Sequence, residues 1–241
     1  MLQQLCALRR PFQVMIGVEI GFLLMYFLQQ LSIFLTFGTF TPSLADTLQT
    51  PIKNMMTIAW VSLAMTYICW VGKAVAYWKF SRTSDELIPT WNIFGRGCWW
   101  LLWIGAIFAH VLLPLVFRFV EPTPAVHNFL AWGTWFGFTL VKLETLCLFL
   151  FTWQIAGVIK SRVVKVWAMI GVGFSVIPML YPLLSRFILP ICANILCDKA
   201  VALLSVNYLN SGLIICSLGT FLTILMRIKR VERVENNMLS L

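Results

Sequence analysis

Six long apolar blocks dominate this 241-residue chain and restrict the folds that it can adopt. Each block is as long as the roughly 18 residues that cross a bilayer as a helix. Only 11% of the residues are charged, against about 25% in soluble domains. In lipid, backbone polar groups need partners within their own segment, so the blocks predict helices. We therefore expect an all-α polytopic membrane protein with a single transmembrane domain over residues 1–241. The expected spans lie near residues 12–37, 55–78, 98–119, 129–159, 163–189 and 209–226.

The basic residues alternate between the two sides of these blocks. The termini and loops on one side of the predicted spans contain 12 of the basic residues, and the loops on the other side contain four. The remaining two, Lys73 and Lys142, fall inside predicted spans. Short cytoplasmic loops are enriched in Lys and Arg, so the 12-residue side is the cytoplasm. This orientation places both termini in the cytoplasm. The net charge of +9 is then a feature of topology, and no dense basic run with interleaved aromatics predicts a nucleic-acid partner.

Five ionisable residues fall inside the predicted spans, where a charge costs roughly 3 kcal/mol on insertion scales. They are Glu19, Lys73, His110, Lys142 and Glu144. The helical rise places Glu19 about 10 Å and Lys73 about 8 Å from the cytoplasmic edge. These matching depths predict an ion pair between the first two spans. The alternative is that Lys73 extends its ammonium group to the cytoplasmic headgroups.

A second polar group is expected deeper in the bilayer. His110 lies about 18 Å and Glu144 about 22 Å from the cytoplasmic edge, so we expect these two to be partners. Lys142 points to nearly the opposite face, because two residues turn a helix by about 200°. Gly133 and Gly137 share the face of Glu144 and predict a close helix contact there. The contact is either a proton- or ion-coupled relay, a polar lining for a substrate path, or a structural clamp.

Three further features concern the second half of the chain. Pro178 and Pro182 interrupt the fifth span and predict a kink. The outer segment 190–210 is expected either on the membrane surface or as a re-entrant piece. Cys192 and Cys197 lie in that segment, where an oxidising compartment permits a disulfide between them. Two His residues in the chain and the lack of a Cys-x-x-Cys pair predict no metal site.

Tryptophans gather where the predicted spans meet the interfaces. One group near the cytoplasmic edge comprises Trp78, Trp91, Trp99, Trp100 and Trp103. Indole rings favour the headgroup level of a bilayer, so these residues predict an aromatic belt. The alternative is an aromatic cage for a ligand.

The stretch 132–139, which reads Trp-Gly-Thr-Trp-Phe-Gly-Phe-Thr, is similar to a motif of the haem-handling membrane subunit of cytochrome c maturation. That family has six spans, both ends inside, and the pattern Trp-Gly-Thr-Trp-Trp followed by an aromatic residue and an Asp. Here Phe136 replaces the last Trp and Thr139 replaces the Asp, and His127 precedes the motif. The family's His ligands come from the first and third outer loops, where this chain has no His. The resemblance therefore assigns no haem ligand in this chain.

The layout also resembles the six-span permease subunit of ABC exporters. The shared features are the span count, a longer cytoplasmic connection after the second span, and an extended outer segment before the sixth. In that family the cytoplasmic connection couples to an ATPase, a role that residues 82–86 would fill by position. This resemblance is one of layout, because no sequence motif specifies it.

No motif of a hydrolase, metalloprotease or P-loop enzyme occurs in the sequence, so we expect a protein that is not an enzyme. The leading hypothesis is a permease or translocation subunit that works with other membrane or cytoplasmic proteins. The alternatives are an assembly or cofactor-delivery component and a structural subunit of a membrane complex. A bacterial inner membrane is the expected location, with an organellar membrane as the alternative. The sequence assigns neither a cofactor nor a substrate.

Overall fold

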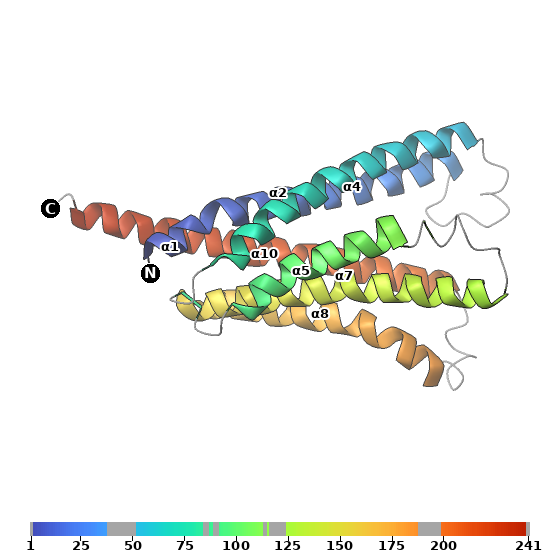
Figure 1. Cartoon of the computed structure of the whole chain (residues 1–241). Coiled ribbons are helices and arrows are strands. Elements are labelled where there is room, and N and C mark those ends of the chain that lie inside the picture. The colour runs from blue at the N-terminus through green and yellow to red at the C-terminus, as the bar shows by residue number, and fades with distance from the viewer. Residues whose placement is uncertain are drawn as a thin grey trace.

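The computed structural model describes residues 2–37, 52–83, 87–88, 92–112, 115, 124–187 and 199–239, and no strand occurs among them. Figure 1 shows the helical bundle that these residues form. Its elements are α1 (Leu2–Ala7), α2 (Arg9–Phe37), α4 (Ile52–Ser81), α5 (Ile93–Ile107), the π-helix η1 (Phe108–Leu112), α7 (Pro124–Val158), α8 (Arg162–Phe187) and α10 (Lys199–Leu239).

The described residues of each predicted apolar block are helical, apart from Ile159 at the end of the fourth block. Four segments in the described part are long and apolar enough to cross a membrane, namely Gln4–Leu28, Ile93–Leu112, Thr139–Val158 and Asn210–Arg233. The fold is therefore all-helical and consistent with a membrane protein. The helix α10 begins at Lys199, so the second half of the segment 190–210 is helical, and its position on the membrane surface or as a re-entrant piece stays a prediction. Residues 190–198, which include Cys192 and Cys197, lie outside the described residues.

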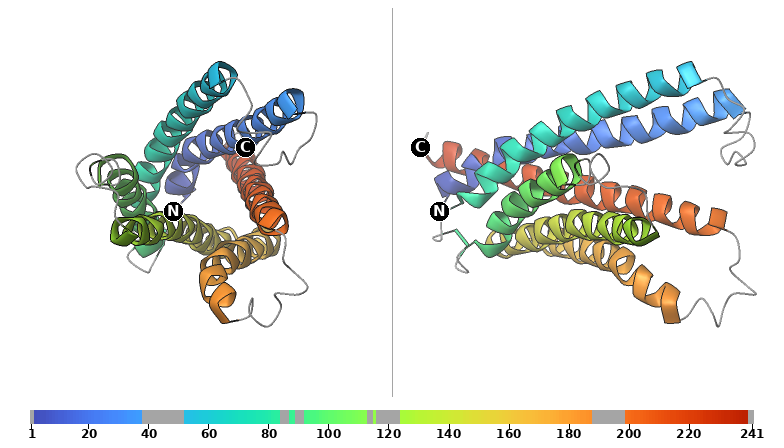
Figure 2. Two further views of the ribbon diagram at one scale, coloured as in Figure 1. Left: turned by 90° about the vertical axis from the view of Figure 1, so that its right-hand side faces the viewer. Right: turned by 45° about the vertical axis from the view of Figure 1, so that its right-hand side comes forward.

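The long helices are arranged as a ring that follows the chain order. Each packs against its neighbours in sequence, from α2 through α4, α5, α7 and α8 to α10, and α10 closes the ring against α2. The left view of Figure 2 looks down the long axis of the bundle, and Figure 1 shows both termini at the same end. At that end, the Arg9 guanidinium on α2 forms an ion pair of 3.0 Å with the Glu232 carboxylate on α10. The first and last long helices are therefore direct neighbours.

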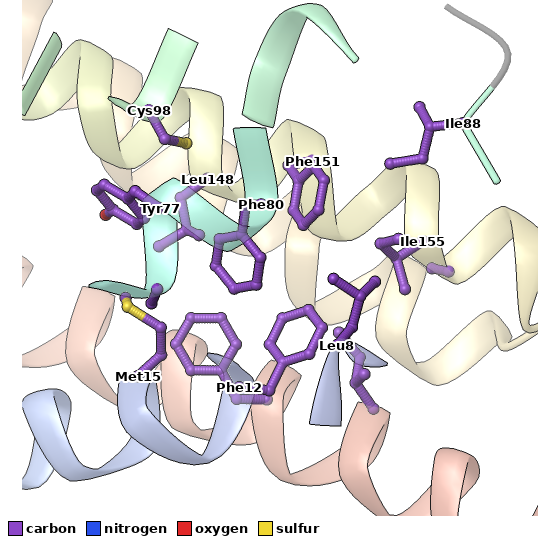
Figure 3. Close-up of a cluster of buried hydrophobic side chains, with 14 of the residues drawn as sticks. Leu8, Phe12, Met15, Tyr77, Phe80, Ile88, Cys98, Leu148, Phe151 and Ile155 are labelled. Atoms are coloured by element: carbon purple, nitrogen blue, oxygen red, sulfur yellow. The ribbon is translucent and has the colours of Figure 1, made fainter. Parts of the chain in front are cut away.

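Four fully buried phenylalanines fill the ring near the termini. Phe12 of α2 lies 5.0 Å from Phe80 of α4 and 5.6 Å from Phe221 of α10, measured between ring centroids. Phe80 in turn lies 4.8 Å from Phe151 of α7. Figure 3 shows the rings of Phe12, Phe80 and Phe151 with Met15, Tyr77 and Leu148 around them. We call the four phenylalanines the aromatic plug, because they join four helices across the interior of the ring.

The other end of the bundle is packed differently. None of the described side chains in residues 20–31 of α2 and 60–68 of α4 is buried, and we call these two segments the open half. There, α2 and α4 diverge from α7, α8 and α10 (Figures 1 and 2). Phe27 is 61% exposed and Trp60 is 64% exposed. Such apolar surface suits contact with lipid, where no hydrophobic effect drives helices together.

Close contacts between neighbouring helices rely on glycines that the sequence does not single out. A Cβ on Gly72 of α4 would lie 2.6 Å from Val18 Cγ2 of α2, and one on Gly171 of α8 would lie 2.3 Å from the Phe149 ring of α7. Real carbon atoms do not approach this closely, so both positions require glycine for the observed packing. Small residues at such contacts allow helix backbones to approach in membranes.

The turn between α4 and α5 is fixed by one buried side chain. Asn92 adopts a left-handed conformation with φ of 49° directly before α5. Its Nδ2 donates hydrogen bonds to the carbonyl oxygens of Phe80 at 2.6 Å and Thr83 at 3.2 Å. The Phe80 carbonyl lies in the last turn of α4, where helices leave backbone acceptors unpaired, and Thr83 follows the end of that helix by two residues. Asn92 therefore ends one helix and starts the next.

Pro178 and Pro182 both lie within α8, whose helical backbone continues to Phe187. The ribbon of α8 bends in the half that contains these prolines (Figure 2). Proline removes a backbone donor and bends a helix without necessarily ending it. The predicted kink is therefore present as a bend within a continuous helix.

Candidate functional site

The main polar contact inside the ring joins α4 to α7. Lys73 Nζ of α4 lies 3.0 Å from Glu144 Oε1 of α7. Tyr77, one helical turn after Lys73, donates its hydroxyl to the same oxygen at 2.9 Å. The side chains of Lys73 and Glu144 are 16% and 6% exposed. Because α5 separates α4 from α7 in the ring, this contact crosses the interior.

A second carboxylate lies beside this pair. Glu19 of α2 is 7% exposed, and a side-chain hydrogen bond joins it to Ser217 of α10. Glu19 also interacts electrostatically with both Lys73 and Glu144. We call Glu19, Lys73, Tyr77 and Glu144 the polar layer. It draws on three helices and contains two carboxyl groups around one ammonium group.

The polar layer lies directly above the aromatic plug, on the side of the open half. Glu19 follows Phe12 by seven residues on α2, a rise of about 10 Å. The Tyr77 ring links the two levels, because its centroid lies 6.2 Å from that of Phe80. Lys73 also lies 5.3 Å from the centroid of the Phe22 ring, on the side of the open half. The interior of the ring thus changes from purely apolar to ionisable within a few turns.

The structure corrects both ion partners expected from depth. The predicted Glu19–Lys73 ion pair is replaced by Lys73–Glu144, because Lys73 reaches across the ring to α7. The predicted Glu144–His110 contact is also wrong. His110 lies on η1 with an exposed side chain, and its Nδ1 is 3.4 Å from the Tyr67 hydroxyl of α4. Depth along a helix fixes the level of a residue but leaves its direction around the ring open.

Lys142 makes a separate polar contact, between α7 and α10. Its Nζ donates to Asn210 Oδ1 at 2.6 Å, and the residue is 5% exposed. Glu144 instead faces α4, as the turn of about 200° between the two residues requires. Together, Glu19, Lys73, Lys142 and Glu144 have no net formal charge. Balanced charges limit the free energy that burial of ionised groups costs in a bilayer.

The two glycines expected beside Glu144 lie on α7. Gly133 is buried. A Cβ on Gly137 would lie 3.5 Å from the Phe108 ring of η1, which is ordinary van der Waals contact. The Phe108 ring also packs 5.1 Å from the ring of Phe136. Gly137 therefore faces a neighbouring helix as expected, but the contact does not demand a glycine.

Cysteine thiols surround the polar layer and bond to neighbouring backbones. Cys69 of α4 donates to the Val18 carbonyl of α2 at 3.8 Å, and Cys98 of α5 donates to the Glu144 carbonyl of α7 at 3.8 Å. They act as small packing residues that also satisfy a backbone acceptor. Within the described ranges, no group of three or more His, Cys, Asp or Glu side chains is placed to hold a metal ion.

Sequence reasoning missed Tyr77, Ser217 and Asn210 as members of these contacts. Tyr77 follows Lys73 by four residues, so the shared helix face could have indicated it. Ser217 and Asn210 depend on α10 lying beside α2 and α7, for which the sequence holds no signal. Comparison of the chain with known families, curated proteins and solved structures finds no match. The arrangement of the polar layer is therefore interpreted from its own geometry.

Proposed function

We propose that this chain is a permease or translocation subunit with six membrane spans and both termini in the cytoplasm. The four apolar segments supply four of these spans. The remaining two are α4 and α8, which contain 30 and 26 residues. At about 1.5 Å per residue, both exceed the roughly 30 Å of a bilayer core. The 12-to-4 division of basic residues supports the cytoplasmic position of the end that holds both termini.

The observation that supports transport best is the polar layer above the aromatic plug. Ionisable side chains within a membrane are kept where they contact one another, a polar solute or an ion path. Here they sit inside a helix ring that is filled by phenylalanines on one side and diverges on the other. This arrangement suits a pathway that is closed towards the cytoplasm. In it, Lys73 and Glu144 form the buried ion pair that lies next to the open half.

A partner on the cytoplasmic side completes the proposal. The connection between α4 and α5 includes residues 82–86, which correspond in position to the coupling segment of ABC exporter permeases. Asn92 anchors the end of this connection to the last turn of α4. A force applied to the connection would therefore reach α4 and its Lys73. We place the complex in a bacterial inner membrane, with an organellar membrane as the alternative.

The partner is tested by purification of the tagged chain in mild detergent. We expect a cytoplasmic ATPase to co-purify in a fixed ratio, with an ATPase rate that falls when residues 82–86 are replaced by a Gly-Ser segment. A matched control replaces residues 234–238 at the end of α10. A chain that purifies alone, or one that binds haem with a Soret band, would contradict the proposal.

The pathway is tested by thiol labelling from the outer side. Phe22→Cys and Met15→Cys are introduced separately into a variant without native cysteines. Phe22 contacts Lys73 above the plug, whereas Met15 is fully buried beside the plug. A charged, membrane-impermeant thiosulfonate should label the residue at position 22 and spare the one at position 15. Equal protection of both positions would favour a solid bundle, in which the polar layer only clamps helices.

A further inference from the structure

A row of four indole rings runs along the seam between α4 and α5. Trp78 lies 5.2 Å from Trp99, Trp99 lies 5.6 Å from Trp103, and Trp103 lies 5.1 Å from Trp70, measured between ring centroids. We call these four residues the tryptophan row. Trp70 and Trp78 are eight residues apart on α4, so the row covers about 12 Å of the helix axis. It begins near the end of α4 that we assign to the cytoplasm.

The row reaches the outside of the ring, where lipid would contact it, at Trp78 and Trp103, whereas Trp70 and Trp99 are half-buried. Trp78 and Trp103 are each 37% exposed, and the adjacent Trp100 is 63% exposed. Ile104 and Ile107 continue this exposed surface along α5. An apolar surface of this kind matches an acyl chain that lies along the helices. The row therefore combines a headgroup-level end with a hydrocarbon-level end.

A cation is fixed at the headgroup-level end. The Arg82 guanidinium carbon lies 3.7 Å from the centroid of Trp78. Lys79 is exposed one turn earlier, on the same side of α4 as Arg82. A guanidinium that stacks by its face keeps its N–H donors free along its own edge, because they lie in the plane of the guanidinium group. Two of these donors fit two oxygens of a phosphate. Within the part of the chain that the structure describes, no carboxylate pairs with Arg82.

We propose that the tryptophan row with Arg82 and Lys79 is a binding site for an anionic phospholipid. The phosphate binds the guanidinium edge of Arg82 and the ammonium group of Lys79, and one acyl chain lies along the exposed indoles. A headgroup with net negative charge attracts both Arg82 and Lys79, whereas the cationic group of a zwitterionic headgroup repels them. A free phosphate ion would make no use of the exposed indoles. The site lies at the outer edge of the seam between α4 and α5 and shares no residue with the polar layer, so it does not depend on what the chain transports.

The test measures lipid binding to the purified full chain in mild detergent by native mass spectrometry. Phosphatidylglycerol and phosphatidylcholine with identical acyl chains are titrated in parallel, with inorganic phosphate as a competitor. Loss of one charge-assisted phosphate contact weakens binding about tenfold. We therefore expect Arg82→Gln to remove the preference for phosphatidylglycerol. Arg233→Gln, which removes an exposed cation on α10 away from the row, should leave the preference intact.

Trp78→Leu provides the second variant, since it retains both cations but removes the surface on which Arg82 stacks. This variant should weaken phosphatidylglycerol binding. If Arg82→Gln fails to fold, Trp78→Leu and the lipid preference of the wild-type chain still test the proposal. Equal binding of the two lipids to the wild-type chain would overturn the proposal. Equal effects of Arg82→Gln and Arg233→Gln would show diffuse attraction in place of a site. Competition by inorganic phosphate at millimolar concentration would identify a free-phosphate site and exclude the lipid.

Discussion

The packed end of the bundle and the open half contrast in how they use the same apolar residue types. Near the termini, phenylalanines from four helices meet in the aromatic plug, and each is fully buried. In the open half, Phe27 and Trp60 are more than half exposed. Since lipid is as apolar as a side chain, burial alone gives little free energy in a membrane. Shape complementarity must therefore hold the packed end together, and its absence leaves α2 and α4 free to diverge.

The polar layer lies at the boundary of the two regions, and its disruption should have the largest effect. Glu144→Leu leaves Lys73 buried without its ion partner and should lower the free energy of unfolding by about 3–5 kcal/mol. Equilibrium unfolding in mixed detergent micelles measures this. The double variant Lys73→Met with Glu144→Leu should recover most of the loss, because an apolar pair of similar volume replaces the ions. A double variant as unstable as the single one would contradict this explanation.

Truncation of one ring should then separate the packed end from the open half. Phe80→Ala creates a cavity among three other phenylalanines and should cost about 2–3 kcal/mol, mainly as lost packing. Phe27→Ala in the open half should change the free energy of unfolding by less than about 0.5 kcal/mol. The same micelle titration compares the two variants. Similar losses at both positions would show that Phe27 packs in the membrane.

A smaller effect is expected from one added methyl group at the α2–α4 contact. Gly72→Ala places a Cβ against Val18 and should cost about 1–2 kcal/mol by overpacking. Gly17→Ala is the matched control, because a Cβ there meets no atom within 4 Å. That control should be neutral or slightly stabilising, since alanine favours helices. Thermal unfolding in detergent separates the two, and a neutral Gly72→Ala would mean that the helices shift apart without cost.

The smallest effect is expected for the ion pair between the two ends of the ring. The Arg9 and Glu232 side chains are 43% and 25% exposed. Partly exposed ion pairs contribute between 0 and about 1 kcal/mol and weaken with salt. Glu232→Gln should therefore lower thermal stability slightly at low salt and not at all at high salt. A large, salt-independent loss would show that this contact, rather than the plug, closes the ring.

Helix positions could be predicted from the sequence, since the described residues of each apolar block are almost all helical. The length of a block and the polarity of its flanks are local properties of the sequence. They can therefore be recognised without knowing which helices pack against the block. Two details are the exceptions. The π-helix Phe108–Leu112 inside the third block and the start of α10 at Lys199, ten residues before the sixth block, follow no hydropathy signal.

The partners of the buried charges could not be predicted. Glu19, Lys73 and Glu144 do lie near one another, yet depth alone paired Lys73 with the wrong carboxylate. The choice depends on how far each helix is rotated and on which helices flank it. Gly72 and Gly171 allow the close α2–α4 and α7–α8 contacts, but neither belongs to the spacing pattern that drew attention to Gly133 and Gly137.

Closure of the ring by α10 has a consequence for biosynthesis. A ribosome synthesises α2 before α10, so the flank of α2 that carries Phe12 and Glu19 lacks its neighbours Phe221 and Ser217 until α10 has been made. A product that ends before α10 would expose an incomplete seam, in which Glu19 lacks its hydrogen bond to Ser217. Proteases that recognise polar groups within the bilayer would then distinguish chains without α10 from chains that contain it. Insertion of α10 therefore protects α2 from degradation.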